Sequence, residues 1–348
     1  MNKLKLVFLG QTDFSPNYFS NILKQYFNIE GFNTLVSYDK NTDIMLFSGK
    51  VDLHIDVFEL LDQGFKFIIV NPYEARPYVS IEKFKPYLEN ILLILGCKNP
   101  YNVGWKNILA VPKWFWYRDH LFYNDPILGY YKNFYVPNRI NSKLFLMPMR
   151  RMRMHRTKIR EKLMEFLDNA IWSYVEVWEN PKNLPTTKNL RLWPDMVFEP
   201  SWYDETVFSI CVETAVNRNK DLNSEIQVLR PEKLACDVFV TEKSFKPIAF
   251  QHPFMVFAMQ GTLEFLRNIG FETYDNLFDE SYDTLEKDDD RLEIIYNNIK
   301  NFSIDNYADI LTQQKIIHNH ELFYDNKKVL EGIEKDIISP MLEWINAR

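Results

Sequence analysis

Hydrophobic residues follow two alternating patterns along this chain, and their alternation predicts an α/β fold. Short continuous apolar runs, of the kind that a parallel strand buried on both faces requires, occur at residues 3–10, 65–70, 91–96, 143–147, 208–212 and 254–259. We expect further short strands at residues 34–38, 43–47 and 109–111. Helical spacing of apolar residues appears between these runs, at residues 15–27, 51–61, 157–167, 242–250 and 262–267. Strands that alternate with helices in this way indicate doubly wound parallel sheets.

The length of the chain predicts two domains. At 348 residues it is about twice the usual domain size. A loop-like stretch at residues 126–141 is the expected linker. We therefore predict two Rossmann-like parallel-sheet domains, at residues 1–135 and 143–325, that face an interdomain cleft. A terminal helix within residues 326–348 is expected to pack back on the domain junction.

The stretch at residues 237–274 contains the clearest candidate chemistry. Thr241 is a suitable N-cap for the predicted helix that follows it. This unit aims Glu242 and Lys243 at the carboxyl edge of a parallel sheet, where open α/β sheets bind their ligands. A carboxylate can accept hydrogen bonds from a ribose diol, and an ammonium, with Lys246 one turn later, can bind a diphosphate. The same residues also fit an exposed helix start whose charges compensate each other.

Four arginines follow the strand predicted at residues 143–147. They are Arg150, Arg151, Arg153 and Arg156. A strand, a basic turn and a helix N-terminus together form an anion site, because the helix dipole adds to the arginine charges. We expect at least one of the four to contact a phosphate. The alternative is that the cluster binds the backbone of a nucleic acid, where each phosphate contact would make the affinity fall with salt.

Four further residues are candidates for the site. Asp13 follows the first predicted strand and is either a general base or a cap for the next helix. Glu74 lies in a loop at the same edge and is a candidate for acceptor contacts and catalysis. His120 is a third candidate base, within an aromatic-rich segment at residues 111–125 that forms either a stacking platform or core. Glu213 ends an apolar run and either touches the nucleotide or has a structural role.

Two blocks of the sequence resemble known glycosyltransferases. VTEKSFKPIAFQHPFMV and QGTLEFLRNIGFETY, at residues 240–256 and 260–274, resemble the donor-binding half of GT-B glycosyltransferases. V-T-E-K in particular resembles a motif of α-1,3-fucosyltransferases, whose Glu binds the ribose and whose Lys binds the diphosphate. FLMPMRRMRMHRTKIREKL, at residues 145–163, is similar to a signature of bacteriophage-encoded, DNA-modifying-type glycosyltransferases, which places an Arg at Arg156. The chain departs from that signature at Pro148 and Met149.

The resemblance, which covers roughly residues 143–300, implies a GT-B-like fold and an enzyme that moves a sugar from a nucleotide-sugar donor to an acceptor hydroxyl. Hydroxymethylcytosine in double-stranded phage DNA is one expected acceptor, and a surface glycan is the other. A non-catalytic module of the same fold that binds nucleic acid or glycan is the alternative. We expect no cofactor beyond the nucleotide-sugar co-substrate and no metal, because D-x-D spacing is absent and basic groups with helix dipoles can hold the diphosphate.

Composition adds a few limits. The three cysteines lack C-x-x-C spacing, which is typical of reduced thiols in a cytoplasmic protein. The sequence has no apolar run long enough to predict a membrane span, and its first residues have the pattern of an ordinary strand. We therefore expect a cytoplasmic protein, in the host cytoplasm if it is viral, that does not bind membranes. The net charge of −6 excludes no partner, because basic and acidic runs are separated along the chain, and the pattern predicts no oligomeric state.

Overall fold

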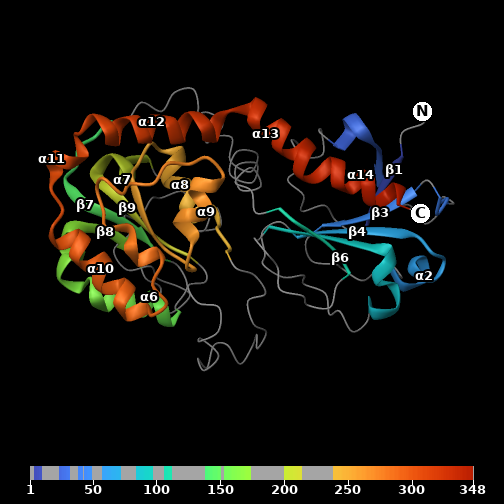
Figure 1. The fold of residues 1–348 in the computed structure, drawn as a ribbon, viewed down its shortest axis with the longest axis horizontal. Coiled ribbons are helices and arrows are strands. Elements are labelled where there is room, and N and C mark those ends of the chain that lie inside the picture. The colour runs from blue at the N-terminus through green and yellow to red at the C-terminus, as the bar shows by residue number, and fades with distance from the viewer. Residues whose placement is uncertain are drawn as a thin grey trace, which may run out of the picture. The chain divides into compact units, whose positions relative to one another are not determined.

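The computed structural model describes residues 4–9, 23–31, 38–41, 43–48, 57–71, 84–96, 106–111, 138–149, 153–173, 200–213 and 238–347. The chain divides into two compact units. The first contains residues 1–129, 235–239 and 325–348, and the second contains residues 130–234 and 240–324. Each unit is built around its own parallel sheet flanked by helices, which confirms the predicted α/β class (Figure 1).

The sheet of the first unit has six parallel strands in the order β2-β1-β3-β4-β5-β6. The strands are β1 (Lys5–Leu9), β2 (Asn28–Gly31), β3 (Asp43–Ser48), β4 (Lys66–Asn71), β5 (Ile91–Leu95) and β6 (Asn107–Ala110). Every residue of β5 is buried, which is why its sequence is a continuous apolar run. The helical segments with described bounds in this unit include α2 (Val57–Asp62), the 3₁₀ helix η1 (Lys85–Asn90), α13 (Asn326–Ile333), the π-helical η7 (Glu334–Ile338) and α14 (Ser339–Asn346).

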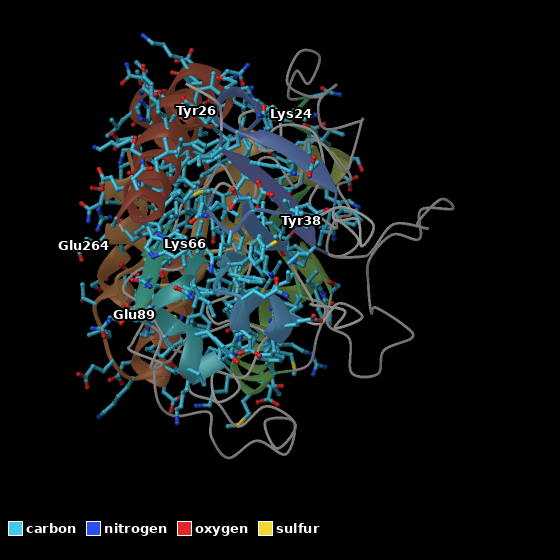
Figure 2. All side chains as sticks on the ribbon, turned by 90° about the vertical axis from the view of Figure 1, so that its right-hand side faces the viewer. Lys24, Tyr26, Tyr38, Lys66, Glu89 and Glu264 are labelled. Atoms are coloured by element: carbon cyan, nitrogen blue, oxygen red, sulfur yellow. The ribbon has the colours of Figure 1, made fainter. Side chains whose placement is uncertain are left out.

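The C-terminal helices belong to the first unit. Lys66 of β4, labelled in Figure 2, donates hydrogen bonds from its ammonium to the carbonyls of Trp344 and Ile345, at 3.1 and 2.9 Å. The same ammonium lies 4.8 Å from the centroid of the Trp344 ring. Because the last carbonyls of a helix have no partner within it, Lys66 caps the end of α14. The expected packing of this segment on the domain junction stays a prediction.

The sheet of the second unit has four parallel strands in the order β10-β9-β7-β8. They are β7 (Lys143–Pro148), β8 (Ala170–Ser173), β9 (Thr206–Val212) and β10 (Phe254–Phe257). The helical segments are α6 (Met154–Lys162), η2 (Met164–Asn169), α7 (Pro200–Glu205), α8 (Glu242–Ala249), α9 (Thr262–Asn268), η6 (Glu280–Asp283), α10 (Asp288–Lys300), α11 (Ile304–Tyr307) and α12 (Ile310–Tyr324).

The two sheets share one rule of strand order. In each, the second strand lies on one side of the first, and the third strand lies on the other side. The order therefore reverses between β1 and β3 in the first unit, and between β7 and β9 in the second. In open parallel sheets such a switch point leaves a crevice at the carboxyl ends of the two strands, and ligands bind there.

Helices cover both sides of the second sheet (Figure 1). α8 packs against α12, where the rings of Phe245 and Phe323 stack at 6.4 Å between centroids. α6 packs against α10, and Lys158 forms an ion pair with Asp289 at 3.1 Å. No helix among the residues that the structure describes combines the length and apolarity needed to cross a membrane.

The structure differs from the predicted elements in several places. Of the strand predicted at residues 34–38, residues 34–37 lie outside the described residues and Tyr38 is not in a strand, while β2 is a strand that was not predicted. The helix predicted at residues 157–167 starts three residues earlier and ends at Lys162, where η2 follows after one residue. α7 was not predicted, because it lies at the end of a stretch with many prolines and tryptophans that has the pattern of a loop.

Candidate functional site at the switch point of the second sheet

The first turn of α6 contacts the end of β9 at the switch point. α6 follows β7, and Glu213 is the first residue after β9. The Nε2 atom of His155 donates a hydrogen bond to the backbone carbonyl of Glu213 at 3.0 Å. The guanidinium of Arg156 lies 3.4 and 3.5 Å from the carbonyl oxygens of Val212 and Glu213. Two neighbouring strands thus bring Arg156 and Glu213 together, although they are 57 positions apart in sequence.

The side chain of Glu213 binds the start of a different helix, α8. Its Oε1 atom accepts hydrogen bonds from the backbone N–H of Thr241 at 2.9 Å and from the hydroxyl of Ser244 at 2.8 Å. Its Oε2 atom accepts one from the hydroxyl of Thr241 at 2.6 Å. Glu213 is 0% exposed. Because both carboxylate oxygens face α8, this geometry favours the structural role predicted for Glu213 over contact with the nucleotide.

Glu242 and Lys243 form a close pair at the start of α8. The predicted N-cap is confirmed, because the Thr241 hydroxyl oxygen accepts a hydrogen bond from the N–H of Lys243. The ammonium of Lys243 contacts the Glu242 carboxylate at 2.7 Å and the Thr241 hydroxyl at 3.0 Å. The two side chains are 17% and 24% exposed, so both reach the surface only in part.

Neighbouring positive charges keep Glu242 ionised. Burial by itself would raise the pKa of Glu242, but the positive charges of Lys243 and Lys246 and the hydrogen bond from Lys243 together lower it to about 2. Glu242 is therefore a carboxylate at neutral pH and can only accept hydrogen bonds. The pair thus offers an acceptor of hydroxyl protons beside a cation that can bind an anion.

A buried thiol replaces a missing backbone donor in α8. Pro247 lies inside this helix and has no N–H, so it cannot make the usual hydrogen bond to the carbonyl four residues earlier, that of Lys243. The Sγ atom of Cys211 instead lies 3.2 Å from that carbonyl oxygen and donates to it. Burial raises the pKa of the Cys211 thiol well above its usual value, which keeps the proton on the sulfur. Cys211 is thus a structural donor in this site.

Positive groups gather at the start of α6. Arg153 is the N-cap residue, and His155 and Arg156 lie in the first turn. Burial and the charges of Arg156 and Arg153 lower the pKa of His155 to about 3, so the imidazole is neutral and its Nε2 carries the proton. Cations near the positive end of a helix dipole are unfavourable unless an anion or other acceptors compensate them. This helix start can therefore attract an anion.

A serine and a histidine form a second pair on β9 and before β10, but this pair is unsuited to nucleophilic catalysis. The Ser209 hydroxyl donates to Nδ1 of His252 at 2.8 Å, and Nε2 of His252 donates to the carbonyl of Thr206 at 2.8 Å. Burial and the charge of Arg139 lower the pKa of His252 well below its usual value. His252 is 0% exposed, so no substrate reaches it. The pair links the strand to the loop after α8.

Of the sequence candidates, one group comes together in the structure. Arg156, Glu213, Thr241, Glu242 and Lys243 are connected by the contacts given above, and Lys246 is close enough for its charge to act on Glu242. Arg153 is the N-cap residue of α6. The candidates Asp13, Glu74, His120, Arg150 and Arg151 lie outside the described residues.

The sequence analysis missed Cys211, His155 and Ser244 as parts of this site. Cys211 lies in β9 and Glu213 directly follows it, and this spacing of two residues could have indicated that both side chains face the same helix. In the parts of the chain that are described, no three His, Cys, Asp or Glu residues form a group that could hold a metal ion. The acidic segment at η6 has a structural role, since Asp283 accepts hydrogen bonds from the N–H groups of Leu263 and Glu264 at the start of α9.

No protein-family model and no curated protein sequence matches this chain. Three solved structures are similar to it, described as α1,3-fucosyltransferase, α1,3-fucosyltransferase with GDP-fucose and α1,3-fucosyltransferase with GDP. They are 10%, 11% and 10% identical to the chain, with TM-scores of 0.47, 0.45 and 0.46. The matches cover 94%, 93% and 95% of this chain and 92%, 91% and 91% of those chains. Such scores leave the function of this chain to be argued from its own residues.

Proposed function

We propose that this chain is a glycosyltransferase that takes a sugar from a nucleotide-sugar donor. The observation that carries the proposal is the meeting of the first turns of α6 and α8 at Glu213, at the switch point between β7 and β9. Ligands of open parallel sheets bind at such points, and helix starts with nearby cations favour phosphates. The resemblance of the V-T-E-K and arginine-rich blocks to GT-B glycosyltransferases supports the same assignment.

In this proposal the two charged side chains of α8 bind different parts of the donor. Glu242, which is ionised at neutral pH, accepts hydrogen bonds from the ribose hydroxyls. Lys243 turns from Glu242 to the diphosphate, and Lys246 and the N–H groups of the helix start add positive potential. As the bond to the sugar breaks, negative charge develops on the departing diphosphate, and these groups stabilise it. The acceptor hydroxyl needs a general base, for which Asp13, Glu74 and His120 remain the candidates.

The test separates the two roles by calorimetric titration with UDP, GDP and ADP. For the nucleotide that binds best, Lys243→Ala should weaken binding of the diphosphate by about tenfold or more and change binding of the monophosphate much less. Glu242→Gln should weaken binding of the diphosphate and of the monophosphate. It should leave binding of the 2′-deoxy diphosphate almost unchanged, because that ligand lacks the 2′-hydroxyl that Glu242 would bind. Failure of the wild-type protein to bind any of the three diphosphates would refute the donor site and favour a non-catalytic binding module.

For the acceptor, we propose the hydroxymethyl group of hydroxymethylcytosine in DNA. This choice is supported only by the resemblance of residues 145–163 to the bacteriophage-encoded proteins, and a surface glycan is the competing acceptor. A base inside a duplex must be flipped out before an enzyme can reach its hydroxymethyl group. Mass spectrometry of hydroxymethylcytosine-containing DNA, incubated with the protein and a panel of nucleotide-sugars, should show the added mass of one sugar. Unchanged nucleoside masses with every donor would exclude DNA in favour of a glycan.

A further inference from the structure

Two side chains at the end of β9 control the first turn of α8. Glu213 follows β9 directly, and its N–H still bonds the carbonyl of Phe257 in the neighbouring strand at 3.0 Å. The chain is therefore extended from Cys211 to Glu213, and side chains two residues apart in an extended chain point the same way. The thiol of Cys211 binds the carbonyl of Lys243, and the carboxylate of Glu213 binds the backbone and hydroxyl of Thr241 and the hydroxyl of Ser244. Cys211 and Glu213 therefore fix the positions of Thr241, Lys243 and Ser244, which surround Glu242 in the sequence.

We infer that Glu213 is a positioning residue for donor binding, which acts on Lys243 through the hydroxyl of Thr241. This inference rests on the proposed function, since it assigns Lys243 to the donor diphosphate. The hydroxyl of Thr241 donates a hydrogen bond to the carboxylate of Glu213 at 2.6 Å. The lone pairs of Oγ1 therefore remain available to accept hydrogen bonds from Lys243. Oγ1 lies 3.0 Å from the ammonium of Lys243 and 3.5 Å from its backbone N–H. Glu213 thereby fixes the direction of the hydroxyl that orients the lysine.

A charged acceptor is needed for this arrangement. Glutamine has nearly the same shape, but its amide nitrogen can only donate, and it would compete with Lys243 for the lone pairs of Thr241. A buried carboxylate at this position loses its hydration. Three hydrogen bonds and the positive end of α8 offset that loss. Lys243 is held from the other side by Glu242, so it has two oriented acceptors in the absence of a phosphate.

A matched control is available on the neighbouring helix. Asp283 is 3% exposed, and its carboxylate accepts hydrogen bonds from the backbone N–H groups of Leu263 and Glu264 in the first turn of α9. Asp283→Asn therefore removes a buried helix-capping charge of the same kind without touching α8. Glu213→Gln and Asp283→Asn should both lower the stability of the protein towards urea. Only Glu213→Gln should alter the lysine.

The experiment compares wild-type protein, Glu213→Gln, Asp283→Asn, Lys243→Ala and the double variant Glu213→Gln/Lys243→Ala, under conditions where urea titrations show all of them folded. Calorimetry measures the Kd of the diphosphate that binds the wild-type protein best. We expect Glu213→Gln to weaken binding about tenfold and Asp283→Asn to have little effect. In the Lys243→Ala background, Glu213→Gln should hardly weaken diphosphate binding any further, because the ammonium that Glu213 orients is no longer present. Equal weakening with and without Lys243, or equal weakening by Asp283→Asn, would overturn the inference.

A second measurement keeps the inference separate from the proposed function. Hydrogen–deuterium exchange of the segment at residues 238–249 should be faster in Glu213→Gln than in the wild type and in Asp283→Asn, with no ligand present. If the wild-type protein binds no diphosphate, the proposed function fails, while this exchange still decides whether Glu213 orders α8. If Glu213→Gln does not fold, Ser244→Ala removes one of the three hydrogen bonds to Glu213 and should show the same faster exchange at smaller amplitude. Unchanged exchange in the variant that folds would refute the role.

Discussion

At the scale of single residues, Pro247 explains why a buried thiol is placed beside α8. A proline in the interior of a helix leaves one carbonyl without its usual donor, and here that carbonyl belongs to Lys243. A buried carbonyl without a hydrogen bond costs about 1–3 kcal/mol, and the thiol of Cys211 removes most of that cost. Pro247 and Cys211 are 36 positions apart in sequence, so no local pattern connects them.

We predict that the effect of Cys211→Ala on stability depends on Pro247. With Pro247 present, Cys211→Ala should lower the free energy of unfolding by about 1–2 kcal/mol, because the Lys243 carbonyl loses its donor and a small cavity forms. In a Pro247→Ala background the alanine N–H can bond the same carbonyl, and the cost of Cys211→Ala should fall to that of the cavity. Urea titrations of the four proteins measure this double-mutant cycle. Equal costs in the two backgrounds would show that the thiol does not replace the missing N–H.

At the scale of elements, the end of α8 contains strain that a substitution can remove. Gln251 follows the last turn with a φ of 52°, in the left-handed region that costs a residue with a Cβ about 1–2 kcal/mol. Glycine adopts this conformation without that cost and is common just after a helix, although its greater freedom in the unfolded chain offsets part of the gain. The position is held in place, because Arg139 donates to the carbonyls of Phe250 and Gln251 at 2.8 and 2.5 Å.

Gln251→Gly should therefore raise the free energy of unfolding by about 0.5–1 kcal/mol. Asn141 is a matched control in the same unit, with a φ of 49°. Asparagine enters the left-handed region more easily than glutamine does, so Asn141→Gly should give a smaller gain. Thermal unfolding of both variants against the wild type measures the difference. A loss of stability in Gln251→Gly would show that the glutamine side chain makes a contact worth more than the relieved strain.

The sequence predicts the elements unevenly, for physical reasons. β5 and β9 are buried on both faces, so their apolar runs stand out. β2 is a short edge strand, N-I-E-G, with almost no apolar pattern, and the sequence analysis missed it. The start of α6 was placed too late because its N-cap, Arg153, makes no side-chain cap, so the usual Ser, Thr, Asp or Asn signal is absent. α8 was placed correctly because Thr241 carries that signal.

The candidate site shows the same limits. Its helix-start charges, Glu242 and Lys243, could be found because a local motif carries them. The link between α6 and α8 could not, because it depends on which strands are neighbours. Strand order places β7 beside β9 and so brings Arg156 to Glu213, and one sequence without its sheet order does not contain that information. The direction of the Glu213 side chain, toward Thr241, is set by the same packing.

At the scale of the whole molecule, buried histidines should make stability depend on pH. Burial lowers the pKa of His320 to about 4, and burial with the charges of Arg156 and Arg153 lowers that of His155 to about 3. Burial and Arg139 likewise lower the pKa of His252. In the unfolded chain these groups titrate near pH 6.5. As the pH falls below about 6.5, the unfolded chain therefore binds protons that the folded chain does not, and this favours unfolding.

We predict that the free energy of unfolding decreases as the pH is lowered from about 6.5 to 5, with a slope of up to about 1.4 kcal/mol per pH unit for each of these histidines. The pKa of Glu242 is about 2 in the folded protein and near 4.5 in the unfolded chain. Its contribution to the free energy of unfolding is therefore fully present above about pH 4.5 and is lost only as the pH falls from there towards 2. Urea titrations between pH 5 and 7.5 measure the slope. His155→Gln keeps an N–H donor for the carbonyl of Glu213 but cannot titrate, so it should make the slope shallower by about the share of one histidine. A slope equal to that of the wild type would show that His155 takes up its proton in the folded protein as readily as in the unfolded chain.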